Sequence, residues 1–438
     1  MHAGLLSGTG GESQSAESRG AFSDWCVQVV LQPTRGNGID GLQIKGRPVT
    51  SQIDVLMSTY NAGRFLPETL ASIQAQTIRD IRIIVVDDGS TDNSAEVLAQ
   101  AAVADPRILI VTQPNRGIVA ALNAGLAHCT APFIARHDAD DLSAPDRLER
   151  QLRYFDHNSD CIALSGSAWQ IDELGLRLGT KTRVRDPALG DPFRVPAREP
   201  YLLQPMLMVR RSALVAANGY RPLLVSEDSD LYWRLQAIGR LHNMDEVLGS
   251  YRMHPQSISS QSIVSGRQTA LCSQLVAVSA QRRKRFMDDL VFDEELVRAV
   301  RQARSMEDML AIGRTRLQPS EMDWFAGAIA AKLIEFCFYR PFELTVEDCR
   351  FIRRSTTNIG HVTTPENAAF LRESIIGTAV RLALKGLKKE AFLLPPPRLL
   401  PVMVLRVVFR AILSDRSRTT IKRLVGRRGP ILVAKKSA

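Results

Sequence analysis

Residues 53–92 read IDVLMSTYNAGRFLPETLASIQAQTIRDIRIIVVDDGSTD, and this stretch decides the fold class. It holds two short apolar runs, at 53–57 and 81–86, which predict buried strands. Between them, Asn61 and Gly63 predict a turn that leads into a helical pattern. A strand, a helix and a second strand in this order predict a βαβ unit, in which the two strands run parallel.

The same alternation continues downstream. Apolar runs at 108–111 and 133–135 predict two further strands, with helical patterns at 95–104 and 118–127 between them. The sequence therefore predicts an α/β domain with a Rossmann-like, mainly parallel central sheet. Because ligands of such sheets bind outside the carboxyl ends of the strands, the residues that follow each strand are the candidates for function.

The composition is that of a globular protein whose charge is unevenly distributed. At 438 residues, with 45% hydrophobic and 23% charged residues, the chain can bury more than one core, so two folded units are expected. The formal net charge of +10 resides in residues 396–438, where eleven Arg and Lys stand against Asp415 alone. We therefore expect a local anionic contact at the tail and no nucleic-acid partner.

Changes in composition and in hydrophobic periodicity divide the chain into four regions. Residues 1–49 are rich in Gly and Ser and read as a flexible N-terminal extension, although a misassigned start codon would look the same. The strand and helix alternation, which we expect to form the catalytic domain, occupies 50–262. A mostly helical C-terminal region without a catalytic motif follows at 263–395, and a basic amphipathic tail at 396–438.

Six dispersed cysteines without a CxxC pair are typical of a reducing compartment. The N-terminal residues lack the basic start and apolar run of a secretory signal. No run of about 20 apolar residues would span a bilayer. We expect a cytoplasmic protein, with peripheral contact at the inner face of the cell membrane as a further hypothesis.

That hypothesis depends on residues 399–413, which are apolar except for Pro401, Arg406 and Arg410. About 15 residues are too few to span a membrane, yet the segment is too apolar to lie bare in water. Either this helix packs on the preceding helical region, or it lies in a membrane interface with its basic flank on anionic lipid. The sequence leaves both readings open.

Polar residues follow the first two predicted strands. The first strand runs into Ser58 and Tyr60, and the second into Asp87 and Asp88. A carboxylate at a strand end can accept hydrogen bonds from a nucleotide base or ribose, and a tyrosine ring can stack on a base. A capped turn between strand and helix would show the same Asp-Asp-Gly-Ser pattern, so this motif alone is a moderate signal.

The fourth strand runs into Asp138, Asp140 and Asp141, three carboxylates within four residues. Carboxylates packed so closely repel one another and become tolerable when a cation lies among them. Hard oxygen ligands favour Mg²⁺ or Mn²⁺. A calcium-binding EF-hand is excluded because Ser143 occupies the position that requires glycine; a plain solvated acidic loop remains the alternative.

Two further motifs lie near the end of the expected catalytic domain. Glu227 and Asp228 precede a helical pattern, where a carboxylate can be either an N-cap or the general base that takes a proton from an acceptor hydroxyl. Arg252 and His254 follow an apolar run, and both side chains could reach a diphosphate or its metal. A lone histidine at such a place is more often structural.

Seven motifs in order resemble the family 2 glycosyltransferases, which have the GT-A fold. These motifs are MSTYN, VVDDGSTD, NRGIVAALNAGL, IARHDADD, PDRLERQ, SEDSDLYWRL and YRMHPQSIS, and together they extend over residues 53–260. The resemblance implies an inverting transferase that moves a sugar from a nucleoside-diphosphate-sugar to a glycan or lipid-linked acceptor. It also implies a role in making cell-surface polysaccharide or glycolipid.

The resemblance also implies roles for donor-binding residues. It places Ser58 and Tyr60 against the nucleotide. It places Asp88 on a uracil or thymine base and Asp138 near the ribose. Arg252 would help to stabilise the charge on the diphosphate.

For catalysis, the resemblance implies that Asp140 is the metal carboxylate of a DxD motif and that His254 is a further metal or diphosphate contact. Asp228 would be the general base, with Glu227 beside it as the second candidate. The implied cofactor is Mg²⁺ or Mn²⁺.

Two other enzyme classes fit the sequence less well, and a third reading is a binding protein. Processive polysaccharide synthases carry QxxRW, whereas residues 235–240 read LQAIGR without a tryptophan. Sugar-nucleotide pyrophosphorylases need a Gly-rich loop that STYNAGRF does not provide. A catalytically silent nucleotide-sugar-binding domain would keep the fold while losing acidic residues, and here the acidic residues are present.

Overall fold

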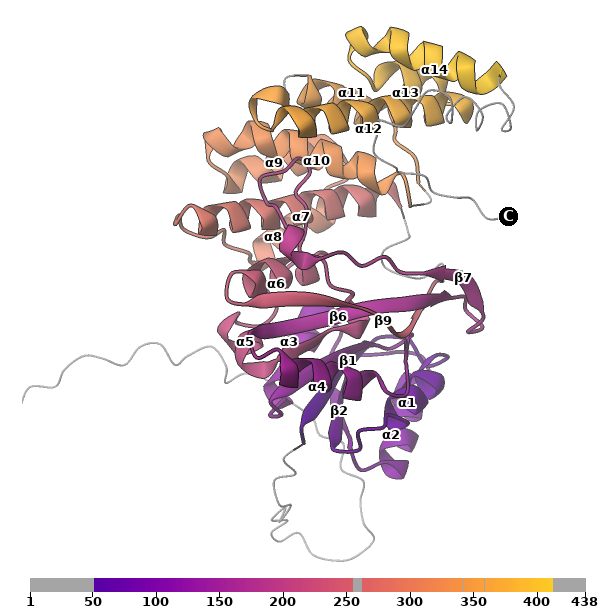
Figure 1. The fold of residues 1–438 in the computed structure, drawn as a ribbon, viewed down its shortest axis with the longest axis vertical. Helices are drawn as coiled ribbons and strands as arrows, with labels where there is room; N and C mark the ends of the chain where they lie inside the picture. The colour runs from indigo at the N-terminus through magenta and orange to yellow at the C-terminus, as the bar shows by residue number, and fades with distance from the viewer. Residues whose placement is uncertain (1–50, 255–261, 341, 358, 413–438) are drawn as a thin grey trace, which may run out of the picture.

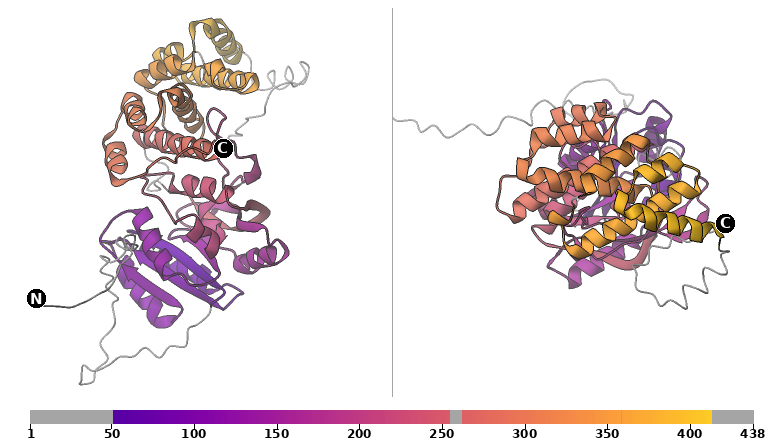
Figure 2. Two further views of the ribbon diagram at one scale, coloured as in Figure 1. Left: turned by 90° about the vertical axis from the view of Figure 1, so that its left-hand side faces the viewer. Right: turned by 90° about the horizontal axis from the view of Figure 1, so that it is seen from above.

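The computed structural model describes residues 51–254, 262–340, 342–357 and 359–412. The expected extension at 1–49 and most of the basic tail lie outside these ranges. The described chain forms a region built on a sheet, from which layers of helices extend (Figures 1 and 2).

The strands form one mixed sheet. Within the described residues it has nine strands in the order β3-β2-β1-β4-β8-β6-β9-β5, with β7 paired to β6 outside this path. The four strands from β3 to β4 are parallel, β8 is antiparallel to both of its neighbours, and β6 and β9 are parallel. The strands are β1 Ile53–Thr59, β2 Ile81–Asp87, β3 Ile108–Thr112, β4 Phe133–Asp138, β5 Leu142–Ser143, β6 Cys161–Ile171, β7 Arg177–Lys181, β8 Met208–Arg210 and β9 Arg240–Arg252.

Helices cover both faces of this sheet, which is why its central strands are nearly all apolar. Alternate residues of β1 point to opposite faces, so Val55 packs with α1, α2 and α4, while Leu56 packs with α3, α5 and α6. Gly125 lets α3 approach closely, because a Cβ there would lie 2.4 Å from the Leu56 Cδ1. The helices are α1 Leu66–Gln74, α2 Ser94–Ala104, α3 Ile118–His128, α4 Arg147–His157, α5 Arg211–Ala216 and α6 Glu227–Gln236.

The remaining helices form the stack that leads away from the sheet (Figure 1). Helix α7 packs on α6 and on α10, so it joins the stack to the sheet region. One core cluster continues across this junction and includes Trp233 of α6. The helices are α7 Ile263–Lys284, α8 Glu294–Gln302, α9 Met306–Arg316, α10 Met322–Phe336, α11 Val346–Thr356, α12 Pro365–Leu384, α13 Lys388–Leu393 and α14 Leu400–Ile412.

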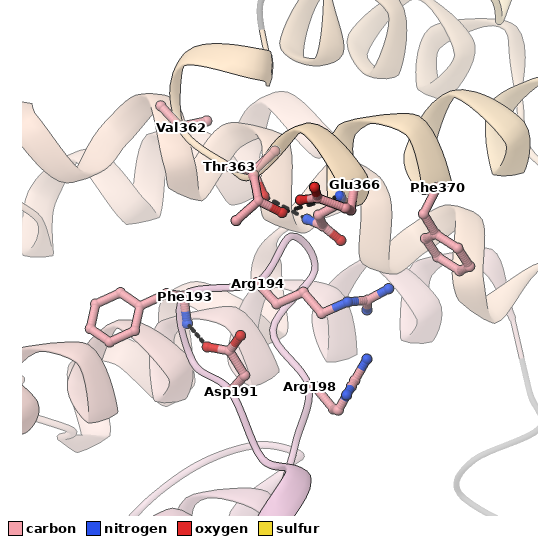
Figure 3. Close-up of a pocket in the computed structure, with 10 residues that line it drawn as sticks. Asp191, Phe193, Arg194, Arg198, Val362, Thr363, Glu366 and Phe370 are labelled. Carbon is pink, nitrogen blue, oxygen red and sulfur yellow. Dashed lines mark hydrogen bonds between the residues drawn. The ribbon is translucent and has the colours of Figure 1, made fainter.

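A hairpin at residues 191–198 inserts from the sheet region into the helical stack (Figure 3). Its Val195 is fully buried in the helical core. The backbone is held by side chains of three helices: Gln281 of α7 donates to the Pro192 carbonyl at 2.7 Å, Trp324 of α10 to Phe193 at 3.0 Å and Asn367 of α12 to Val195 at 2.9 Å. The two regions therefore share one packed core.

The expected fold class is confirmed: an α/β region with a parallel strand core is followed by a helical C-terminal region. The division at residues 262 and 263 stays a prediction. In the described part of the chain, every helix is too short or too polar to cross a bilayer.

Candidate active site

The carboxyl ends of β1, β2 and β4 meet at one edge of the sheet. Ser58 of β1 pairs with Val86 of β2 and with Asp138 of β4, so the polar residues that follow these strands lie at one level. Tyr60 is half exposed just beyond β1. The structure therefore brings the strand-end motifs together, as expected for a parallel sheet.

Asp88 is more enclosed than its sequence position suggests. The side chain is buried, and the turn after it depends on Gly89, whose φ is +75°. The carboxylate accepts hydrogen bonds from Gln113 Nε2 at 2.7 Å and from the backbone N–H groups of Arg116 at 2.9 Å and Gly117 at 2.8 Å. Asp88 thus fixes the loop that opens α3.

Three carboxylates gather where β4 ends. Ligand oxygens of Asp138, Asp140 and Asp141 all lie within 4.8 Å of one another. Arg136 NH2 pairs with Asp138 Oδ1 at 2.7 Å, and His254 Nε2 lies 2.8 Å from Asp140 Oδ2. Asp138 and Asp140 remain partly exposed at the mouth of the site.

Asp141, one of the three carboxylates that the sequence predicts to gather after the fourth strand, is the buried member of the cluster. Its Oδ1 accepts the Arg252 backbone N–H at 2.7 Å, while its Oδ2 is buried without a hydrogen-bond partner in the described part of the structure. Burial, followed by the charges of Asp140 and Asp138, raises the Asp141 pKa well above its ordinary value.

This donor set fits a divalent cation. It offers clustered carboxylate oxygens, one of them buried and unpaired, together with an imidazole next to Asp140. Hard cations such as Mg²⁺ and Mn²⁺ prefer oxygen ligands, and a cation would relieve the repulsion that raises the Asp141 pKa.

Arg252 lies beneath the cluster rather than over it. Its side chain is 1% exposed. The guanidinium donates to the Asp140 carbonyl at 2.7 Å, to the Glu68 carboxylate at 2.7 Å and to the carbonyls of Asp172 and Glu173. The predicted contact with a donor diphosphate stays a prediction, and these bonds favour a role in holding the cluster.

Glu227 and Asp228 open α6. The N-cap of this helix is Ser226, and the Asp228 Oδ1 accepts the N–H of Ser229 at 2.7 Å. Burial, then the charge of Glu199, raises the Asp228 pKa to about 6. Burial, then the charge of Asp228, raises the Glu227 pKa to about 8. Both shifts disfavour the ionised forms, and the larger rise is that of Glu227.

Glu199 and Lys332 complete the surroundings of this pair, and neither was identified from the sequence. Glu199 Oε2 accepts the Ser229 hydroxyl at 2.8 Å, next to Asp228 in the chain. Lys332 of α10 is buried and lies 3.2 Å from Glu199 Oε1. No local pattern could have predicted this pair, because the two residues are far apart in sequence and meet only through the packing of the helical stack.

Comparisons with known proteins agree with this geometry. The model of the glycosyl transferase family 2 matches residues 54–216. The putative glycosyltransferase EpsE of Bacillus subtilis is 30% identical over 262 residues, which cover 58% of this chain and 91% of EpsE. The amylovoran biosynthesis glycosyltransferase AmsE of Erwinia amylovora is 30% identical over 45% of this chain and 75% of its own length.

Two solved structures are similar at lower identity. TarS of S. aureus, residues 1–349, has a TM-score of 0.42 at 13% identity, covering 74% of this chain and 90% of that chain. A mannosyltransferase from Pyrobaculum calidifontis, in complex with GDP-Man and Mn²⁺, has a TM-score of 0.44 at 16% identity, and the match covers 82% of this chain and 87% of that chain.

The chain combines a Rossmann-like sheet region and a helical C-terminal region with sequence relatives that are glycosyltransferases. On the strength of its sequence relatives, the chain belongs to glycosyltransferase family 2 and is a glycosyltransferase.

The raised pKa of Glu227 predicts a specific dependence of stability on pH. The folded-state pKa of about 8 exceeds the ordinary value of 4.5, so the native protein keeps a proton that the unfolded chain loses. The free energy of unfolding should therefore fall as pH rises from about 4.5 to 8. Glu227→Gln should reduce that fall in chemical denaturation at pH 5 to 8, relative to wild type and to the surface control Glu294→Gln. Equal slopes for all three proteins would contradict the assignment.

Proposed function

We propose that this protein is a metal-dependent, inverting glycosyltransferase that moves a sugar from a nucleoside-diphosphate-sugar to an acceptor hydroxyl. The observation that carries the proposal is the meeting of the acidic cluster after β4 with the carboxyl pair at the start of α6. The charge of Asp138 contributes to the raised pKa values of both Glu227 and Asp228, which supports assigning the two groups to one site.

Donor binding would use the edge of the sheet. Ser58 and Tyr60 would lie against the nucleotide, and the partly exposed Asp138 would accept from the ribose. Asp88 would shape the base site, since its carboxylate fixes the loop at 113–117. Arg252 would support the diphosphate site by holding Asp140 and Asp141 in place.

Asp140 and His254 would hold Mg²⁺ or Mn²⁺. When bound, the cation would neutralise the charge that builds on the departing diphosphate. Phe65 supports His254, because the two rings lie 5.2 Å apart. The carboxyl pair at α6 would then face the acceptor.

Asp228 is the better candidate for the general base. A base must be ionised at working pH, and a pKa of about 6 meets that condition, while a pKa of about 8 keeps Glu227 protonated. Removal of the acceptor proton by Asp228 would activate the hydroxyl for in-line attack. Attack from the face opposite the leaving diphosphate would invert the anomeric centre.

We propose that the acceptor is a glycan or a lipid-linked sugar, from which a cell-surface polysaccharide or glycolipid is made. The similarity to AmsE, whose name places it in amylovoran biosynthesis, supports a role in polysaccharide synthesis. This chain differs from processive synthases in lacking QxxRW, which favours transfer of one sugar or a few.

The tail is proposed to contact the membrane. In α14, Met403 is buried against the stack, and Arg406 pairs with Glu373 of α12 at 2.8 Å, so part of the helix packs on the helical region. Leu405 is 69% exposed and Val408 is 46% exposed, which leaves an apolar strip uncovered. The basic residues that follow lie outside the described residues.

Asp140→Ala should abolish transfer, because the diphosphate would then meet the remaining carboxylates without a neutralising cation. The variant should still fold, and Asp160→Ala, at the opposite end of β6, should keep full activity as a control. Transfer is measured with a panel of nucleotide-sugars, with Mn²⁺, with Mg²⁺ or with EDTA. Near-normal activity of Asp140→Ala in EDTA would refute the metal assignment.

Asp228→Asn keeps the side-chain size but cannot take the acceptor proton, so turnover should fall by about 10² to 10⁴. Donor affinity, measured by titration calorimetry, should be unchanged. Wild-type activity should fall as pH drops through about 6, where Asp228 becomes protonated. Loss of donor affinity with unchanged turnover would instead assign Asp228 to the nucleotide site and leave Glu227 as the base.

Full-length protein should sediment with liposomes that contain anionic lipid, and a chain ending at Pro395 should not. Each basic residue near the surface contributes about 1 kcal/mol, so binding should weaken with salt. Equal binding by both proteins, or binding that ignores lipid charge and salt, would rule out the tail as a membrane contact.

A further inference from the structure

A cavity of about 480 Å³ lies outside the edge of the sheet, between the hairpin at 191–198 and the start of α12 (Figure 3). This volume falls within the range of small-molecule sites, which is about 300 to 1,000 Å³. Phe193, Arg194 and Arg198 line it from the hairpin, and Asn367 and Phe370 from α12. The cavity is thus formed jointly by the sheet region and the helical stack.

Two arginines of this cavity lack a partner for their charge within the described ranges of the chain. Neither the Arg194 nor the Arg198 guanidinium makes a hydrogen bond or an ion pair there. Arg194 instead lies over the Phe370 ring, 4.8 Å from its centre. Figure 3 shows both guanidinium groups on the same side of the hairpin. Burial and then the charge of Arg198 lower the Arg194 pKa, and the charges of Glu335 and Asp191 offset only part of that effect, so a bound anion would stabilise the pair further.

The cavity also offers acceptors for hydroxyl groups. Asn367 is 7% exposed, its Nδ2 donates to the carbonyl of Val195 and to Thr363, and its Oδ1 has no partner in the described structure. The carboxylates of Asp191 and Glu366 line the same space without pairing with either arginine. One Asp191 oxygen, Oδ1, accepts the Phe193 N–H at 2.9 Å, and the Asn367 Oδ1 and the other carboxylate oxygens are acceptors that sugar hydroxyls can satisfy.

This cavity is adjacent in sequence to a neighbour of the proposed catalytic base. Arg198 is followed in the chain by Glu199, which accepts the hydroxyl of Ser229 beside Asp228 and pairs with Lys332. This adjacency is the reason for assigning the ligand of the cavity to the acceptor.

We propose that the cavity binds an acidic sugar residue of the acceptor glycan, with Arg194 and Arg198 holding its carboxylate or phosphate group. The hydroxyl groups of that sugar would donate to Asn367 and to the neighbouring carboxylates, while Arg194 stays over the Phe370 ring. The proposal rests on the proposed function, because it makes this sugar part of the acceptor.

Binding to the full-length protein is measured by titration calorimetry with glucuronate, glucose 1-phosphate, glucose and inorganic phosphate. Glucuronate, glucose 1-phosphate or both should bind saturably and at least tenfold more tightly than glucose and inorganic phosphate.

The double variant Arg194→Ala/Arg198→Ala should lose at least tenfold in affinity. Arg194→Gln/Arg198→Gln, which keeps most of the side-chain bulk, should lose as much. Arg177 of β7 lies over Trp169 of β6, outside the cavity, so the control variant Arg177→Ala should bind the acidic sugars like wild type.

Three outcomes would overturn the proposal: no saturable binding of either acidic sugar, full binding by both double variants, or inorganic phosphate binding as tightly as the acidic sugars. Asp140→Ala separates this site from the proposed function, because it should lose transfer and keep the binding of the acidic sugar. Binding in the cavity without any transfer by wild type would disprove the proposed function and leave an acidic-sugar site whose ligand is not an acceptor.

Discussion

The structure depends on keeping three carboxylates together at the end of β4. Like charges at this distance repel, and Asp141 is buried, so the cluster persists only because cationic and hydrogen-bonding groups surround it. Arg136 pairs with Asp138, and Arg252 supplies its backbone N–H to Asp141 and its guanidinium to the Asp140 carbonyl. The repulsion that remains is what a divalent cation would relieve.

Holding the three carboxylates together requires residues from distant parts of the sequence. Strand β9 runs beside β6 along its length and delivers Arg252 beneath the cluster and His254 to its side, more than 100 residues after Asp141. The buried Arg147 supports the cluster from behind: its NH2 donates to the Arg136 carbonyl at 2.9 Å, and burial lowers its pKa to about 9. The acidic site is therefore a product of the whole sheet rather than of one loop.

The local patterns of the sequence were sufficient to predict the parallel strands and the strand-end motifs. The four predicted strands exist, and β4 extends to Asp138, three residues beyond its apolar run, because pairing with β1 continues into the polar residues. Within the helical region expected at 263–395, α8 ends at Gln302 and Ser305 caps α9 with a capping box. Caps of this kind are visible in a sequence.

What the sequence could not predict are contacts whose partners have no fixed spacing. Ser58, Asp138 and Asp140 lie where strand order places them, since parallel strands end at one edge. The enclosure of Asp88 by the loop at 113–117 and the burial of Arg252 depend instead on side chains brought together by folding. A motif therefore locates a residue at the site without saying whether its side chain faces the ligand.

The same limit explains why the sequence of the helical stack gave no sign of a contribution to the site. Among the described residues of the stack, Lys332 of α10 reaches Glu199 beside the carboxyl pair, and it also pairs with Glu335 at 3.4 Å. Glu199 raises the Asp228 pKa, and Lys332 lies 3.2 Å from Glu199, so it offsets part of the negative charge beside Asp228. That arrangement requires the hairpin at 191–198 to pack in the helical core. Glu199 follows the hairpin directly, so the position of Glu199 depends on the hydrogen bonds that hold Phe193 and Val195. Through Glu199, the helical stack and the carboxyl pair at the start of α6 are in this way linked electrostatically.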